Sequence, residues 1–165
     1  MKKLTIIFAL VVIGLTAQSG FGQTTGDDRA NLIRAARFLE EKPFDKDAPK
    51  MREWAFLYVA QTKDVSVVIC AGPLIRPMLE KKNKYGDELL NQYAIAMAAF
   101  KLQNPDRKSD ENAAQLAGLE SALKAYEKMV AGDSKAKYAA LDELLAKRDK
   151  GELKALVEAA DCAKK

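Results

Sequence analysis

The chain has 165 residues, a formal net charge of +4 and no histidine. The lack of histidine excludes serine-histidine-acid and cysteine-histidine catalytic arrangements, histidine-ligated catalytic zinc and an imidazole pH switch. The glycines form neither a P-loop pattern nor GxGxxG, which disfavours nucleotide-binding enzymes of those classes.

The N-terminus has the pattern of a secretory signal peptide. Lys2 and Lys3 precede an apolar run over residues 4–15, and small and polar residues follow. A transmembrane anchor needs roughly 18 apolar residues, so we expect cleavage and no stable membrane insertion afterwards. We assign residues 1–22 to the signal peptide, with cleavage after Ser19 as the other option. The protein is therefore expected to be secreted or periplasmic.

The remaining residues, 23–165, are predicted to form a single helical domain. About 140 residues are enough to bury a hydrophobic core without staples. Loss of Lys2 and Lys3 lowers the net charge of +4 by two, and the other charges are interspersed. Neither nucleic acid nor an anionic membrane surface is therefore an expected partner.

Apolar residues at helical spacing, together with capping residues, predict seven amphipathic helices. In chain order, we expect them over residues 29–41, 50–61, 65–84, 87–103, 110–131, 134–150 and 152–163. The short connections favour antiparallel neighbours, which predicts an all-α fold of stacked helical hairpins. A closed helical bundle is the alternative.

The third predicted helix has the weakest pattern. Residues 65–71 are rich in β-branched side chains, which favours a strand, but no second run of this kind is present to pair with them. We therefore predict a helix that Asp64 caps and that breaks at Pro73 and Pro77.

The fourth and fifth predicted helices together resemble a tetratricopeptide-type repeat. The residues that carry the resemblance are Tyr93, Ala96, Met97 and Phe100 in the first helix and Ala122, Tyr126 and Met129 in the second. Met97 stands where the family has glycine, and the unit is about a dozen residues longer than the standard period of about 34. The resemblance covers residues 89–134. It implies a right-handed stack of hairpins with a concave protein-binding face. The chain also resembles uncharacterised secreted bacterial helical proteins.

The two cysteines, Cys70 and Cys162, are predicted to form a disulfide. An exported protein folds outside the reducing cytosol, and neither cysteine belongs to a CxxC motif. The bond would close a loop of about 90 residues, worth up to about 4 kcal/mol in the chain-entropy treatment. Two separate buried thiols are the alternative.

The sequence favours a non-enzymatic module that binds another protein or peptide. Trp54 is the only tryptophan, and its helical spacing predicts a core position between helices. A partner groove between hairpins would be lined by aromatic residues such as Trp54, Tyr93 or Tyr126. No cofactor or metal site is predicted.

Two other functions stay open. The first is a small hydrolase that uses paired carboxylates from different helices, since carboxylates adjacent in sequence point about 100° apart and cannot converge. The second is a secreted inhibitor or toxin-neutralising protein.

Thiol titration of the denatured protein without reductant tests the disulfide prediction. We expect no reactive thiol, because both cysteines are oxidised. Two reactive thiols would contradict the bond.

Overall fold

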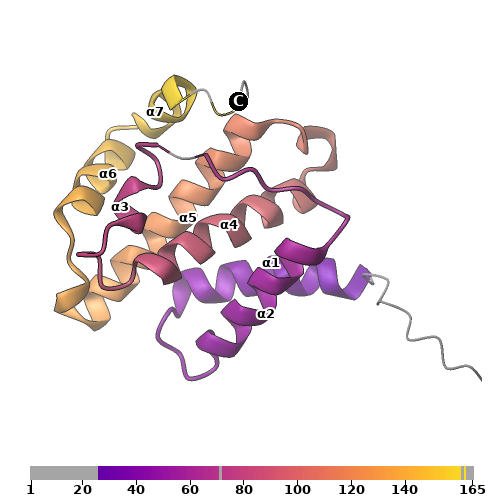
Figure 1. Ribbon diagram of the computed structural model, residues 1–165, viewed down its shortest axis with the longest axis horizontal. Helices are drawn as coiled ribbons and strands as arrows, with labels where there is room; N and C mark the ends of the chain where they lie inside the picture. The colour runs from indigo at the N-terminus through magenta and orange to yellow at the C-terminus, as the bar shows by residue number, and fades with distance from the viewer. Residues whose placement is uncertain (1–25, 71, 161, 163–165) are drawn as a thin grey trace, which may run out of the picture.

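The regular structure of the described part of the chain is helical. Figure 1 shows the computed structural model, which describes residues 26–70, 72–160 and 162. Within these residues, the α-helices are α1 (Gly26–Glu41), α2 (Ala48–Gln61), α3 (Arg76–Leu79), α4 (Gly86–Gln103), α5 (Glu111–Gly132), α6 (Ala139–Asp149) and α7 (Leu153–Ala160). Two short 3₁₀ helices accompany them, η1 (Pro105–Arg107) and η2 (Ser134–Ala136).

The predicted all-α fold with about seven helices is confirmed. The predicted signal peptide, residues 1–22, lies outside the described residues, so its assignment stays a prediction. Among the helices that the structure describes, none has the length and apolar character required to cross a lipid bilayer.

Helices α4 and α5 form the centre of the molecule. They pack against each other, with α1 and α2 on one side of the pair and α3, α6 and α7 on the other (Figure 1). The core has two clusters that follow this division. The larger includes Leu119 and Leu141, and the smaller includes Leu32 and Leu39.

Helix α4 buries both of its faces. Leu89, Tyr93 and Met97 belong to the larger cluster, whereas Ile95 and Ala98 belong to the smaller. A helix that is apolar on every side is expected in a protein interior. This central position explains why α4 contains so many alanines, which let α1 and α5 approach it closely.

Helices α4 and α5 approach each other closely at Gly118. A Cβ atom there would lie 2.7 Å from the Cγ of Met97 and 2.8 Å from the carbonyl oxygen of Tyr93. These separations are too short for a real Cβ, so only glycine fits without a shift of one helix.

The helix predicted over residues 65–84 is wrong in its first part. The structure has no helix in 65–70, and α3 is a single turn that begins later, at Arg76. The segment gains no helical hydrogen bonds. Instead, the carbonyl of Ser66 accepts from Lys101 Nζ at 2.8 Å, and that of Val68 accepts from Gln115 Nε2 at 2.6 Å. Side chains of the central helices therefore supply the hydrogen bonds that a neighbouring strand would otherwise give to these carbonyls. The β-branched residues keep a non-helical backbone.

Several helix ends agree with their sequence signals and others shift. Asp110 caps α5, where its Oδ1 accepts from the N–H of Ala113 at 3.0 Å. The sixth helix was expected from Ser134, but α6 begins at Ala139, because a 3₁₀ turn precedes it in which Asp133 accepts from the N–H of Lys135 at 2.9 Å.

Replacement of Gly118 by alanine is expected to destabilise the protein by about 1–3 kcal/mol, because the added methyl group overpacks the α4–α5 contact. This cost exceeds the gain in helix propensity of at most about 1 kcal/mol. Urea unfolding measures the difference.

Gly132→Ala is the matched control on the same helix. Its Cβ would meet only the side chain of Phe44, with the closer of two ring carbons at 3.0 Å, and this ring is 45% exposed, so it can give way more easily than the backbone at Gly118. We expect a change within about 0.5 kcal/mol. Equal effects of the two substitutions would contradict the close approach at Gly118.

Candidate functional site

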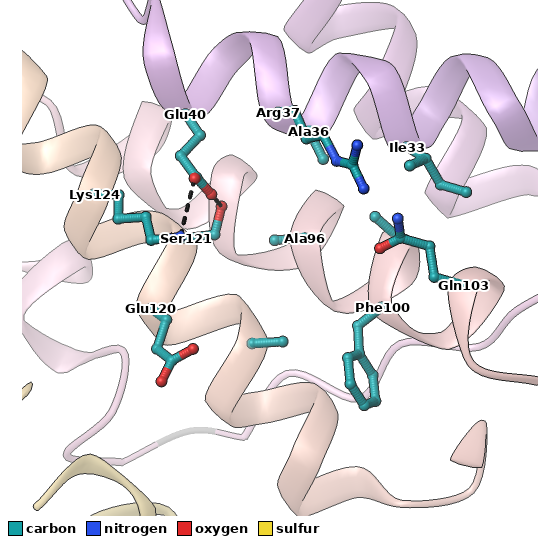
Figure 2. A pocket seen from close by; sticks show the side chains of 12 residues that line it. Ile33, Ala36, Arg37, Glu40, Ala96, Phe100, Gln103, Glu120, Ser121 and Lys124 are labelled. Atoms are coloured by element: carbon teal, nitrogen blue, oxygen red, sulfur yellow. Dashed lines mark hydrogen bonds and ion pairs between the residues drawn. The ribbon is translucent and has the colours of Figure 1, made fainter. Parts of the chain in front are cut away.

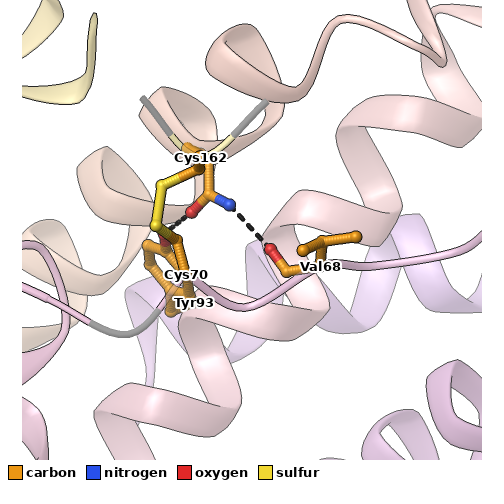
Figure 3. The surroundings of a disulfide bond; sticks show 5 residues. Val68, Cys70, Tyr93 and Cys162 are labelled. Carbon is orange, nitrogen blue, oxygen red and sulfur yellow. Dashed lines mark hydrogen bonds between the residues drawn. A yellow bond between two sulfur atoms is a disulfide. The ribbon is translucent and has the colours of Figure 1, made fainter. Parts of the chain in front are cut away.

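A disulfide joins the predicted pair of cysteines. Cys70 and Cys162 have a Cα–Cα distance of 5.5 Å and are separated by 92 positions in the sequence. Both residues are buried, and Figure 3 shows the bond between them. The bond ties the segment before α3 to the end of the chain after α7, and it confirms the predicted pairing.

Tyr93 lies in the core beside this disulfide. It is fully buried, its hydroxyl donates to Gln115 Oε1, and Gln115 in turn donates to the carbonyl of Val68 (Figure 3). Burial raises the pKa of the Tyr93 hydroxyl well above its usual range. The expectation that Tyr93 lines a partner groove is therefore wrong, because α4 is enclosed on both faces.

Tyr126 is a second core residue that was expected at a groove. It is 1% exposed, its hydroxyl donates to Asp142 Oδ1 at 2.8 Å and accepts from the N–H of Tyr138 at 2.7 Å. Burial, with a smaller contribution from Asp142, raises the pKa of Tyr126 to about 12. Tyr126 thus fixes the start of α6 and is not accessible to a partner.

Trp54 has the opposite environment. The expectation of a core position is wrong, since Trp54 is 37% exposed and its ring stacks on that of Tyr58 with centroids 5.8 Å apart. The inward positions of α2 belong to Ala55 and Tyr58, which are buried against α1 and α4. Of the three aromatic residues proposed for a groove, only Trp54 is available on the surface.

Trp54 lines a groove between α1 and α2 with a volume of about 680 Å³. Its apolar lining is formed by Ala35, Phe38, Met51 and Trp54. Its polar lining is formed by Asp28, Asn31, Arg34, Asp47 and Lys50. An apolar floor with a few charged groups at the edges is the general form of a binding groove.

A smaller polar cavity lies between α1, α4 and α5 (Figure 2). Its volume is about 260 Å³. Glu40 Oε2 accepts from Ser121 Oγ at 2.6 Å, and Glu40 Oε1 lies 3.3 Å from Lys124 Nζ. Gln92 is 2% exposed and donates from Nε2 to Ser121 Oγ at 2.8 Å and to the carbonyl of Ala36 at 2.9 Å.

This polar cluster holds three helices together and does not form a nucleophilic site. Ser121 is in the middle of α5, where backbone N–H groups bond within the helix, so no backbone oxyanion hole can form beside its hydroxyl. The carboxylate of Glu120 points away from that of Glu40 (Figure 2). The cavity therefore does not bring two acids to one point.

Metal binding finds no support in the described part of the chain either. No group of three or more cysteine, aspartate or glutamate side chains in it is arranged to hold a metal ion.

No family model, curated protein or solved structure matches the chain. The function therefore has to be argued from the geometry of the α1–α2 groove and the polar cavity.

The sequence gives little sign of the cluster at Ser121. Ser121 and Lys124 are neighbours on one helix turn, but Glu40 and Gln92 come from distant positions. The one available signal is a glutamine, Gln92, among the apolar residues in the middle of α4, because buried amides require partners.

Ser121→Ala is expected to lower the free energy of unfolding by about 1–3 kcal/mol, because it removes both the hydrogen bond that the Ser121 hydroxyl donates to Glu40 and the one that it accepts from the buried Gln92. Lys124→Ala removes only the ion pair with Glu40, in which the lysine side chain is 54% exposed. This substitution should lower the free energy of unfolding by less than about 1 kcal/mol. Chemical unfolding of both variants checks this order, and the reverse order would contradict the role of Ser121.

The raised pKa of Tyr126 predicts alkaline destabilisation. The folded state holds the phenolic proton to about pH 12, against an ordinary pKa of 10.0, so this contribution is complete below pH 10 and is lost as the pH rises towards 12. The stability advantage of the wild type over Tyr126→Phe should therefore shrink over this range in urea unfolding. A constant difference would show that the Tyr126 pKa is not raised.

Proposed function

We propose that the chain is an exported, non-enzymatic module that binds an amphipathic helix of a partner protein in the groove between α1 and α2. The half-exposed Trp54 in this groove carries the proposal. Tryptophan is common among the residues that dominate binding energy, and a large apolar groove rarely stays open to water without a function.

The geometry of the α1–α2 pair favours a helical occupant. On the inner side, both helices pack against α4, so the pair already accommodates one helix. The groove is the equivalent feature on the outer side, and its floor of Phe38, Met51 and Trp54 can receive apolar side chains spaced along one helix face.

Two cations at the groove, Arg34 and Lys50, favour an acidic residue near them on the partner helix, while Asp28 and Asp47 line the groove as well. Arg34 comes from α1 and Lys50 from α2. Arg34 donates to the neutral side chain of Asn31, and no ion pair among the described residues involves Lys50. A partner carboxylate between them would have two cationic neighbours. Such charge contacts fix the register and orientation of the bound helix more than they raise its affinity.

Two observations support export. The leader pattern at residues 1–22 is that of a secreted chain, and the Cys70–Cys162 disulfide belongs to an oxidising compartment. The resemblance to tetratricopeptide repeats is consistent with a binding scaffold, and a repeat ancestry stays a proposal.

A phage-displayed library of amphipathic helical peptides, selected on the oxidised protein, tests the groove. We expect enrichment of peptides with apolar residues at helical spacing and a central acid. Anisotropy of a labelled selected peptide gives the dissociation constant. Trp54→Ala should raise it at least about tenfold, since the ring supplies much of the apolar contact.

Phe56→Ala is the control, because Phe56 is 41% exposed on the same helix but does not line the groove. It should change the dissociation constant less than about twofold. If the selected peptides bind Trp54→Ala as tightly as the wild type, the groove is not the binding site.

Reversal of the two groove cations tests the partner charge. The double variant Arg34→Glu, Lys50→Glu should weaken binding of the acidic peptide and improve binding of its lysine analogue. Isothermal titration measures both. Equal losses for the two peptides would mean that charge has no part in recognition.

A further inference from the structure

The segment over residues 65–69 crosses α4 and α5 between α2 and α3 without helical structure (Figure 1). The carbonyls of Ser66 and Val68 accept from Lys101 on α4 and Gln115 on α5, at 2.8 and 2.6 Å. In an extended chain, the peptide groups of residues i and i+2 point to the same edge. These two contacts therefore define an inner edge that faces the central helices.

The opposite edge carries the N–H and C=O groups of Val67 and Ile69. Within the described residues, no hydrogen bond involves these four groups. The side chains of Val68 and Ile69 are also 46% and 41% exposed. Between the helices of the described structure, this segment thus presents a short strand-like edge with exposed apolar side chains.

This edge is held in place at both ends. Arg29 forms a two-point ion pair with Asp64 just before the segment, with the shorter contact at 2.6 Å, and the disulfide at Cys70 follows it. Natural sheet edges are protected from pairing by charged residues, proline or bulges. Residues 65–69 contain no charge and no proline.

We propose that two copies of this chain pair through this edge, antiparallel about Val68. In that register Val67 faces Ile69 of the second copy and Ile69 faces its Val67, and each pair exchanges both N–H···O bonds. Val68 then faces its own counterpart in the closer, non-hydrogen-bonded position. In this two-fold symmetric arrangement, all four unpaired N–H and C=O groups on each copy form hydrogen bonds.

A second copy is favoured over an unrelated strand because the segment is its own complement. The two unpaired residues are placed symmetrically about Val68, and an uncharged segment meets no like charge when it pairs with itself. The exposed β-branched side chains are those that stabilise cross-strand pairs.

Sedimentation velocity of the oxidised protein over a concentration series tests the dimer, together with amide exchange resolved by NMR. We expect a monomer–dimer equilibrium in which the amides of Val67 and Ile69 gain protection as dimer forms, while those of Ser66 and Val68 do not change. A monomer at every concentration, or a dimer without this alternation, overturns the proposal.

Two charge variants test the register independently of folding defects. Val68→Lys and Val68→Glu should each raise the dissociation constant at least about tenfold, because like charges meet at the axis. An equimolar mixture of the two should form heterodimers. Leu79→Lys, at a residue 55% exposed but away from the edge, is the control and should dimerise as the wild type does. Loss of dimer in the control, or no heterodimer in the mixture, would contradict pairing at Val68.

Discussion

Close contact between α4 and α5 is the constraint on which the rest of the structure depends. Gly118 lets the backbone of α5 approach Tyr93, and Tyr93 then reaches Gln115, whose amide holds the carbonyl of Val68. The same pair of helices supplies Lys101, which is 5% exposed and binds both Glu111 and the carbonyl of Ser66. A buried ammonium group is tolerated because both contacts compensate its lost hydration.

Because α4 is buried on both faces, the surfaces available to partners lie on the outer elements. The α1–α2 layer uses its inner face against α4, which leaves Trp54 on the outside. The crossing segment uses one edge against α4 and α5, which leaves the groups of Val67 and Ile69 on the other. Both proposed interfaces are thus consequences of one central helix pair, and neither requires the pair to move.

The sequence predicts the helices where local signals agree, and it fails where tertiary contacts decide. The apolar spacing that predicts helices over residues 87–103 and 110–131 is local, and α4 and α5 follow it. The segment over 65–70 differs, because its conformation depends on Lys101 and Gln115, which are far away in sequence.

The same limit applies to the aromatic residues of the candidate groove. Helical spacing shows that Trp54, Tyr93 and Tyr126 each belong to an amphipathic helix, but it does not show which helix is enclosed on every side. α2 lies at the outside and α4 at the centre, so Trp54 is exposed and Tyr93 is not. What separates the two residues is the layering of the helices, with α4 inside and α2 outside, and no local pattern encodes this layering.

Native-state hydrogen exchange tests this layering most directly. Amides of α4 and α5 should exchange only through global unfolding, and those of α2 through smaller openings. Local opening of α4 or α5 while α2 stays protected would contradict it.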